Sequence, residues 1–136
     1  HLRRWALPRE ELPEGRAGYL RWRAAQRKRH GEEVAVILDA AGYGPEEVRR
    51  VQQLVRKEGL GRDRAVQTHE DALCLVFVQT EFEELVDRLG PERMVDIVAK
   101  TLRKMSPPAI AAAVQQPMSA AARGVVERAA ALVAAG

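Results

Sequence analysis

Residues Thr68-His69-Glu70-Asp71-Ala72-Leu73-Cys74-Leu75-Val76-Phe77-Val78 decide the fold, because they place two carboxylates at the head of the most apolar run in the chain. A glycine-rich turn precedes this run and Gly90-Pro91 follows it, so we predict one long helix from about Gln67 to Leu89. At helical spacing, Asp71 falls on the same stripe as the apolar residues Cys74, Leu75, Val78 and Phe82. The spacing therefore predicts that Asp71 faces the core.

Two explanations fit Asp71 at this position. A buried carboxylate is costly unless it meets a cation, a metal or several hydrogen-bond donors, which favours a functional site. Alternatively, Thr68 and Asp71 fit a capping box at the start of a helix, where an acidic side chain favours the positive end of the helix dipole. The motif alone leaves both explanations open.

Length and composition predict a single all-α domain over residues 1–136, long enough for a hydrophobic core. No stretch approaches the roughly 18 uninterrupted apolar residues of a membrane helix, so we expect no membrane association. Cys74 is the one cysteine and lies in an apolar run, which indicates a buried, inert thiol in a reducing cytoplasm. The chain begins at His1 with no methionine, so we expect a fragment whose true start is missing.

Glycine and proline mark the predicted helix ends, and no alternating strand pattern or repeat occurs. The fold class is therefore all-α, a compact single-domain bundle of about six or seven helices. After a last helical turn at residues 1–5 and an ordered loop to Gly15, we predict helices over residues 16–41, 45–58, 67–89, 91–106, 109–116 and 119–134.

Positive charge is concentrated at the start of the chain. The first 30 residues hold nine Lys or Arg against three Glu, a net charge of +6, whereas the whole chain carries only +3. Such a local positive field suggests an anionic partner, whether phosphate, nucleotide or nucleic acid. The candidate anion-binding residues are Arg3, Arg4, Arg16, Arg21 and Arg23.

Aromatic residues lie among these arginines, at Tyr19 and Trp22. Arginine clamps phosphate bidentately, and an aromatic ring can stack on a base or sandwich an arginine. The plainer alternative is a solvated basic helix face whose two aromatics belong to the core.

The chain contains no Walker loop, no Rossmann glycine pattern and no His-Glu-x-x-His or Cys-x-x-Cys motif. What remains is a scattered set of nitrogen and oxygen ligands, His1, His30 and Asp71, on three predicted helices. Such a set suits one divalent metal ion, Mn, Fe, Zn or Mg. Alternatively, His30 is a hydrogen-bonded core histidine on the apolar stripe of its helix, and His1 is an exposed chain end.

Several segments together resemble the uncharacterised family named domain of unknown function 4202. They cover most of the chain in order: residues 1–5, 13–23, 51–57, 70–77 and 100–106. Members of that family usually carry a further helical segment before the position of His1, which agrees with the expectation of a fragment.

More remotely, the layout is similar to the HD-domain superfamily of helical metal-dependent phosphohydrolases. This resemblance implies that His1 matches the histidine of the His-Asp pair, His30 the next metal-site histidine and Asp71 the late aspartate. Leu2 stands where the aspartate of the pair belongs, and Lys57 lies near a further histidine of many members. The departures favour a site for one metal ion, or a degenerate fold that binds an anion without metal.

The leading hypothesis is an HD-like domain that hydrolyses a phosphate ester or nucleotide. Its pocket would contain His1, His30 and Asp71 as metal ligands and Glu70 or Asp71 as catalytic base, with the five arginines on its rim. The second hypothesis is a non-catalytic module whose basic N-terminal third binds an anion, RNA or an acidic protein. In a third, Glu70 and Asp71 pair with the arginines and hold the helices together.

Overall fold

The structure is a computed structural model that describes residues 3–135, and over these residues it is helical with no strand. This confirms the predicted all-α class. The chain divides into two compact units, residues 1–59 and 60–136, and the single-domain organisation stays a prediction. None of the helices within residues 3–135 combines the length and the apolar character needed to cross a bilayer.

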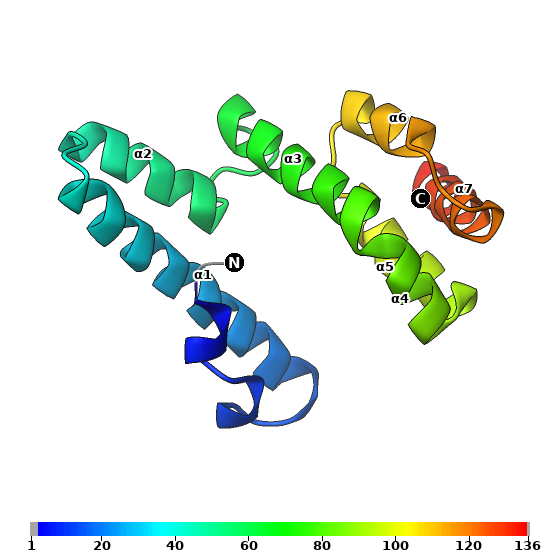
Figure 1. Ribbon diagram of the computed structural model, residues 1–136, viewed down its shortest axis with the longest axis horizontal. Coiled ribbons are helices and arrows are strands. Elements are labelled where there is room, and N and C mark those ends of the chain that lie inside the picture. The colour runs from blue at the N-terminus through cyan, green and yellow to red at the C-terminus, as the bar shows by residue number, and fades with distance from the viewer. Residues whose placement is uncertain (1–2, 136) are drawn as a thin grey trace. The chain divides into compact units, whose positions relative to one another are not determined.

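The first unit is a helical hairpin of α1 (Gly15–Ala40) and α2 (Pro45–Arg56), preceded by the short 3-10 helices η1 (Arg4–Ala6) and η2 (Arg9–Glu11) (Figure 1). The turn forms where predicted: Gly42 has a φ of 84°, a conformation that favours glycine, and proline opens α2. Helix α2 ends before Gly59, because Lys57 adopts a left-handed conformation with a φ of 59°.

Polar side chains of α1 hold the N-terminal segment, residues 3–14, against the helix. Donors along one face of α1 bind backbone carbonyls of this segment, two of which also accept hydrogen bonds within the 3-10 turn. These bonds run from Trp22 Nε1 to the Leu7 carbonyl at 2.9 Å, from Gln26 Nε2 to the Arg4 carbonyl at 2.8 Å, and from Arg29 Nη2 to the Arg3 carbonyl. The segment is thus bound through its backbone. Residues 4–6 form a 3-10 turn in place of the predicted α-helical turn.

Gly18 marks the closest approach of this segment to α1. A Cβ atom at Gly18 would lie 1.7 Å from the carbonyl oxygen of Pro13, so only glycine leaves room for the loop. Arg9 closes the same loop by donating to the carbonyls of Leu12 at 3.0 Å and Pro13 at 2.9 Å.

Gly31 plays a comparable part where α1 meets α2. A Cβ atom there would lie 2.3 Å from Nε of Arg56, so the Arg56 side chain occupies the space that glycine leaves. Gln52 of α2 also donates to the Gly31 carbonyl at 3.0 Å. These polar contacts therefore contribute to holding α1 and α2 together.

The second unit contains the helices α3 (Arg64–Thr80), α4 (Phe82–Leu89), α5 (Pro91–Leu102), α6 (Pro107–Gln115) and α7 (Ala120–Ala134) (Figure 1). All five helices contribute to one hydrophobic core, in which α5 packs on α7 and α3 on α4 and α6. The predicted inward residues of α5 are buried, among them Met94, Val98 and Leu102. This core supplies the main apolar stabilisation.

The predicted helix over residues 67–89 is wrong in its continuity. It begins earlier, at Arg64, and is divided at Glu81 into α3 and α4. The division lets Phe82 bury its side chain completely, with its ring centroid 6.3 Å from that of Phe77. The hydroxyl of Thr80 donates to the Val76 carbonyl at 2.8 Å, a contact that favours bending a helix.

The core-facing stripe of α3 agrees with the prediction at Cys74 and Val78 but differs from it at the carboxylate. The buried positions are Val66, Glu70, Cys74 and Val78, and Glu70 is only 2% exposed. Asp71 is half-buried. The carboxylate that enters the core is therefore that of Glu70.

Gly18→Ala should destabilise the chain, because the added methyl group overlaps the Pro13 carbonyl and forces the loop away from α1. We expect a loss of about 1–3 kcal/mol in the free energy of unfolding, measured by urea denaturation, and faster proteolysis within residues 6–14.

Gly124→Ala in α7 is the matched control, because nothing lies within 4 Å of its added Cβ. It should stabilise the chain by roughly 0.4–1 kcal/mol. Equal effects of the two substitutions would contradict the close approach at Gly18.

Candidate functional site

The start of α3 is capped by Asp63. Its carboxylate accepts hydrogen bonds from the backbone N–H groups of Ala65 at 2.9 Å and Val66 at 3.2 Å. The predicted capping box at Thr68 and Asp71 is therefore wrong, because Thr68 already lies inside the helix and donates to the Arg64 carbonyl at 2.9 Å. Asp71 must have another role.

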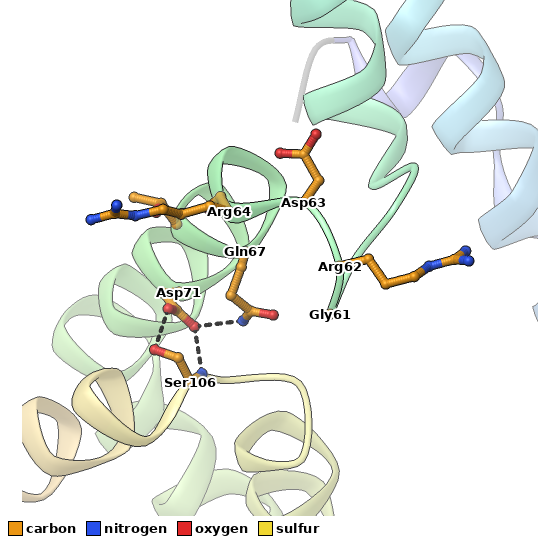
Figure 2. Close-up of a pocket in the computed structure, with 8 residues that line it drawn as sticks. Gly61, Arg62, Asp63, Arg64, Gln67, Asp71 and Ser106 are labelled. Atoms are coloured by element: carbon orange, nitrogen blue, oxygen red, sulfur yellow. Dashed lines mark hydrogen bonds between the residues drawn. The ribbon is translucent and has the colours of Figure 1, made fainter.

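Asp71 joins α3 to the start of α6. Its Oδ2 accepts from the hydroxyl of Ser106 at 2.6 Å, and its Oδ1 accepts from the Ser106 backbone N–H at 2.9 Å. Gln67, one turn earlier on α3, donates to the same Oδ1 at 2.9 Å and to the Lys104 carbonyl at 2.8 Å. Figure 2 shows the three side chains meeting at this point. Asp71 thus meets several donors, one of the alternatives expected for a buried carboxylate.

These contacts determine the protonation of Asp71. Burial, the largest single effect, raises its pKa, but the hydroxyl and N–H of Ser106 and the amide of Gln67 together lower it further. The net pKa lies below the ordinary aspartate value. Asp71 is consequently ionised at neutral pH and is a weaker base than an ordinary carboxylate, which suits an anchor or a ligand better than a general base.

A surface pocket of about 360 Å³ lies beside this cluster, lined by Gly61, Arg62, Asp63, Arg64, Gln67, Thr68, Asp71 and Ser106. Figure 2 shows the guanidinium groups of Arg62 and Arg64 directed away from Asp71. The ionised carboxylate is therefore stabilised by the uncharged donors of Ser106 and Gln67.

Two of the three predicted metal ligands belong to the residues that the structure describes, one in each unit. His1 is outside the described residues, His30 is half-buried on α1, and Asp71 belongs to the cluster with Ser106. Within residues 3–135, no group of three or more His, Cys, Asp or Glu side chains could hold a metal ion. The metal site stays a prediction, as does the catalytic role of Glu70.

The predicted anion-binding arginines are all exposed in the first unit, and within residues 3–135 none of the five forms an ion pair with a carboxylate. On α1, Arg16 and Arg23 share one side, together with Arg27, whereas Arg21 lies about 140° around the helix. Arg3 and Arg4 belong to the N-terminal segment. We call Arg16, Tyr19, Arg23 and Arg27 the basic stripe.

Two arginines and two aromatic rings form a continuous stack. The guanidinium carbon of Arg4 lies 4.7 Å from the Trp22 ring centroid, the Trp22 and Tyr19 rings stack at 6.2 Å, and Arg23 lies 5.8 Å from the Tyr19 ring. Trp22 is buried at 7% exposure, as expected if it belongs to the core, but Tyr19 is 45% exposed. The two aromatics therefore have different roles.

The sequence reasoning did not identify Gln67 and Ser106 as partners of Asp71. Gln67 precedes Asp71 by four residues, a helical spacing at which side chains meet, so the sequence held that signal. Ser106 is 35 residues away, and only the packing of α6 brings it to Asp71.

Comparison with known families bears on both regions. The chain matches the model of the family described as Domain of unknown function (DUF4202) over residues 1–126. The chain belongs to this family. The DUF4202 match includes both the basic stripe and the Asp71 cluster. No curated protein and no solved structure matches the chain, and the HD-domain similarity stays a prediction.

Asp71→Asn should destabilise the chain at neutral pH, because it removes the negative charge and replaces one acceptor oxygen by an NH2 group. Hydrogen bonds to a charged group contribute about 1.5–3 kcal/mol, and we expect a loss of that order in the free energy of unfolding. Because the folded pKa is lowered, the contribution is complete above the unfolded pKa of about 4 and is lost as the pH falls through the folded value. The gap between wild type and variant should therefore narrow below about pH 4 in urea titrations.

Asp96→Asn removes the same charge from an exposed position on α5 and serves as the control. It should change stability by less than about 0.5 kcal/mol. If the difference in unfolding free energy between wild type and Asp71→Asn does not depend on pH, the stabilising role of the ionised Asp71 carboxylate is contradicted.

Proposed function

We propose that the chain binds a phosphate-containing ligand, such as a nucleotide or nucleic acid, through the arginines of its first 30 residues. One observation carries the proposal: the five candidate arginines are exposed and, within residues 3–135, unpaired with carboxylates. An exposed guanidinium offers a planar fork of donors that matches phosphate oxygens.

The other arginines of this region supply a contrast. Arg9 donates to three backbone carbonyls of its own loop, and Arg29 pairs with Glu33 at 2.7 Å. These two side chains are committed to the fold. Of the five candidate arginines, Arg4 and Arg23 contact only aromatic rings, so the N–H donors of this group stay available for phosphate.

The proposal predicts a salt-dependent affinity for phosphate polymers. Replacing Arg16 and Arg23 together by glutamine should weaken the binding of inorganic polyphosphate to the full chain at least several-fold. It should also reduce the slope of log affinity against log salt by about one for each phosphate that the variant no longer neutralises. Fluorescence titration at several salt concentrations measures both quantities.

Arg88→Gln combined with Arg93→Gln removes the same charge from exposed positions in the second unit, as a control. If both double variants weaken polyphosphate binding equally, the loss of affinity reflects net charge alone and not the position of Arg16 and Arg23. Absent or salt-insensitive binding by the wild-type chain would contradict the proposal.

A metal-dependent phosphohydrolase is the second candidate. It is supported by the HD-like layout and by the adjacent carboxylates of Glu70 and Asp71 on α3, of which Asp71 has a lowered pKa that keeps it in the ionised form that metals bind. In this candidate, His1, His30 and Asp71 hold the ion, which would polarise a phosphoryl oxygen. The arginines would hold the phosphate in both candidates.

Metal analysis by mass spectrometry of the full-length, tag-free protein separates the two candidates. If the chain is a metal-dependent phosphohydrolase, we expect about one divalent ion per chain. The ion should be lost in a folded His30→Ala variant, because a site with few protein ligands cannot spare one of them. If the protein is folded, has not been exposed to a chelator and still contains no metal, the phosphohydrolase candidate is contradicted. The binding module then remains.

A further inference from the structure

We propose that the basic stripe of α1 binds single-stranded nucleic acid and that Tyr19 is the surface on which a base stacks. The inference rests on the proposed function, because the same arginines would contact the phosphates. It adds a ligand class and a residue that recognises the base.

Tyr19 is held in position before any ligand arrives. Its ring stacks on Trp22 with an interplanar angle of 29°, and Trp22 is fixed by its hydrogen bond to the Leu7 carbonyl and by Arg4 on its ring. Although Trp22 is buried, Tyr19 keeps 45% of its surface exposed. A rigid, exposed ring costs little entropy to use as a binding surface.

Arg23 is the solvent-exposed end of the stack. Its guanidinium lies 5.8 Å from the Tyr19 centroid, close to the roughly 6 Å limit of a cation–π contact, and its side chain is exposed. Guanidinium planes and aromatic rings both stack on unpaired bases. Arg23 can therefore move outward and cover a base that rests on Tyr19.

Positive charge flanks Tyr19 along the helix. Arg16 precedes it by one turn, and Arg23 and Arg27 follow at one and two turns on the same side. From Arg16 to Arg27 the helix rises by about 16 Å. A strand lying along this stripe would place its phosphates against the arginines and one base on the ring.

Unpaired bases distinguish this ligand from the other anions. In a duplex the bases are stacked inside and a ring on a helix surface cannot reach their faces, whereas an acidic peptide supplies charge without a base to stack. The combination of Tyr19 with arginines therefore favours a single strand.

The test compares a short oligouridylate with inorganic polyphosphate of equal charge, each titrated against the full chain. Tyr19→Leu should weaken oligouridylate binding by roughly 5- to 150-fold, the range of one stacked base, and leave the salt slope unchanged. Polyphosphate binding should not change. Tyr19→Phe keeps the ring and should bind the oligonucleotide as the wild type does.

Tyr43→Leu is the matched control, since Tyr43 is 51% exposed in the same unit but lies outside the stripe. It should bind both probes normally. A Tyr19→Leu variant that keeps oligouridylate affinity, or loses affinity for both probes equally, would overturn the stacking role. Tighter binding of polyglutamate than of oligouridylate would overturn the nucleic-acid ligand in favour of an acidic protein.

The stacking inference and the proposed function fail in different ways. If wild-type protein binds neither polyphosphate nor oligouridylate, the phosphate-binding function itself is wrong. If it binds both with equal affinity regardless of Tyr19, phosphate binding stands and the stacking inference alone is overturned.

Discussion

The backbone carbonyls of the N-terminal segment impose the constraint on which the first unit depends. Residues 3–14 form only two short 3-10 helices, so many of their carbonyls have no partner within a regular helix. Donors from α1 bind two of these carbonyls: the indole of Trp22 and the amide of Gln26 donate to Leu7, and Gln26 also donates to Arg4, which already accepts from the Leu7 N–H. This attachment places Arg4 over Trp22, and Trp22 in turn supports Tyr19. The exposed ring of the basic stripe thus depends on hydrogen bonds made to backbone.

In the second unit, a carboxylate has a comparable role. Asp71 accepts from both the N–H and the hydroxyl of Ser106, and it thereby ties the start of α6 to α3. The ionised carboxylate of Asp71 accepts stronger hydrogen bonds than the protonated form. The bonds that attach α6 to α3 therefore also lower the pKa of Asp71. Asp71, which the sequence presents as a candidate ligand or base, is therefore also a structural anchor. Its replacement would change the stability of the fold as well as any chemistry at the site.

Membership of the DUF4202 family assigns no activity, so the chemistry must be argued from the residues. The two candidate functions share their ligand class, because each uses uncommitted arginines for phosphate. They differ in whether a metal ion takes part, and that difference can be measured without knowing a substrate. The stack of Arg4, Trp22, Tyr19 and Arg23 is independent of the metal question.

The sequence by itself determined the helical class and most helix ends, because glycine and proline act on the backbone where they stand. Gly42, Pro45, Pro91 and Pro107 each mark an end within a few residues of the prediction. The tertiary structure alone decided the division at Glu81, the burial of Glu70 in place of Asp71, and the contact of Asp71 with Ser106. These features depend on packing between residues far apart in the chain, and no local pattern encodes which of two adjacent carboxylates will meet a particular neighbour.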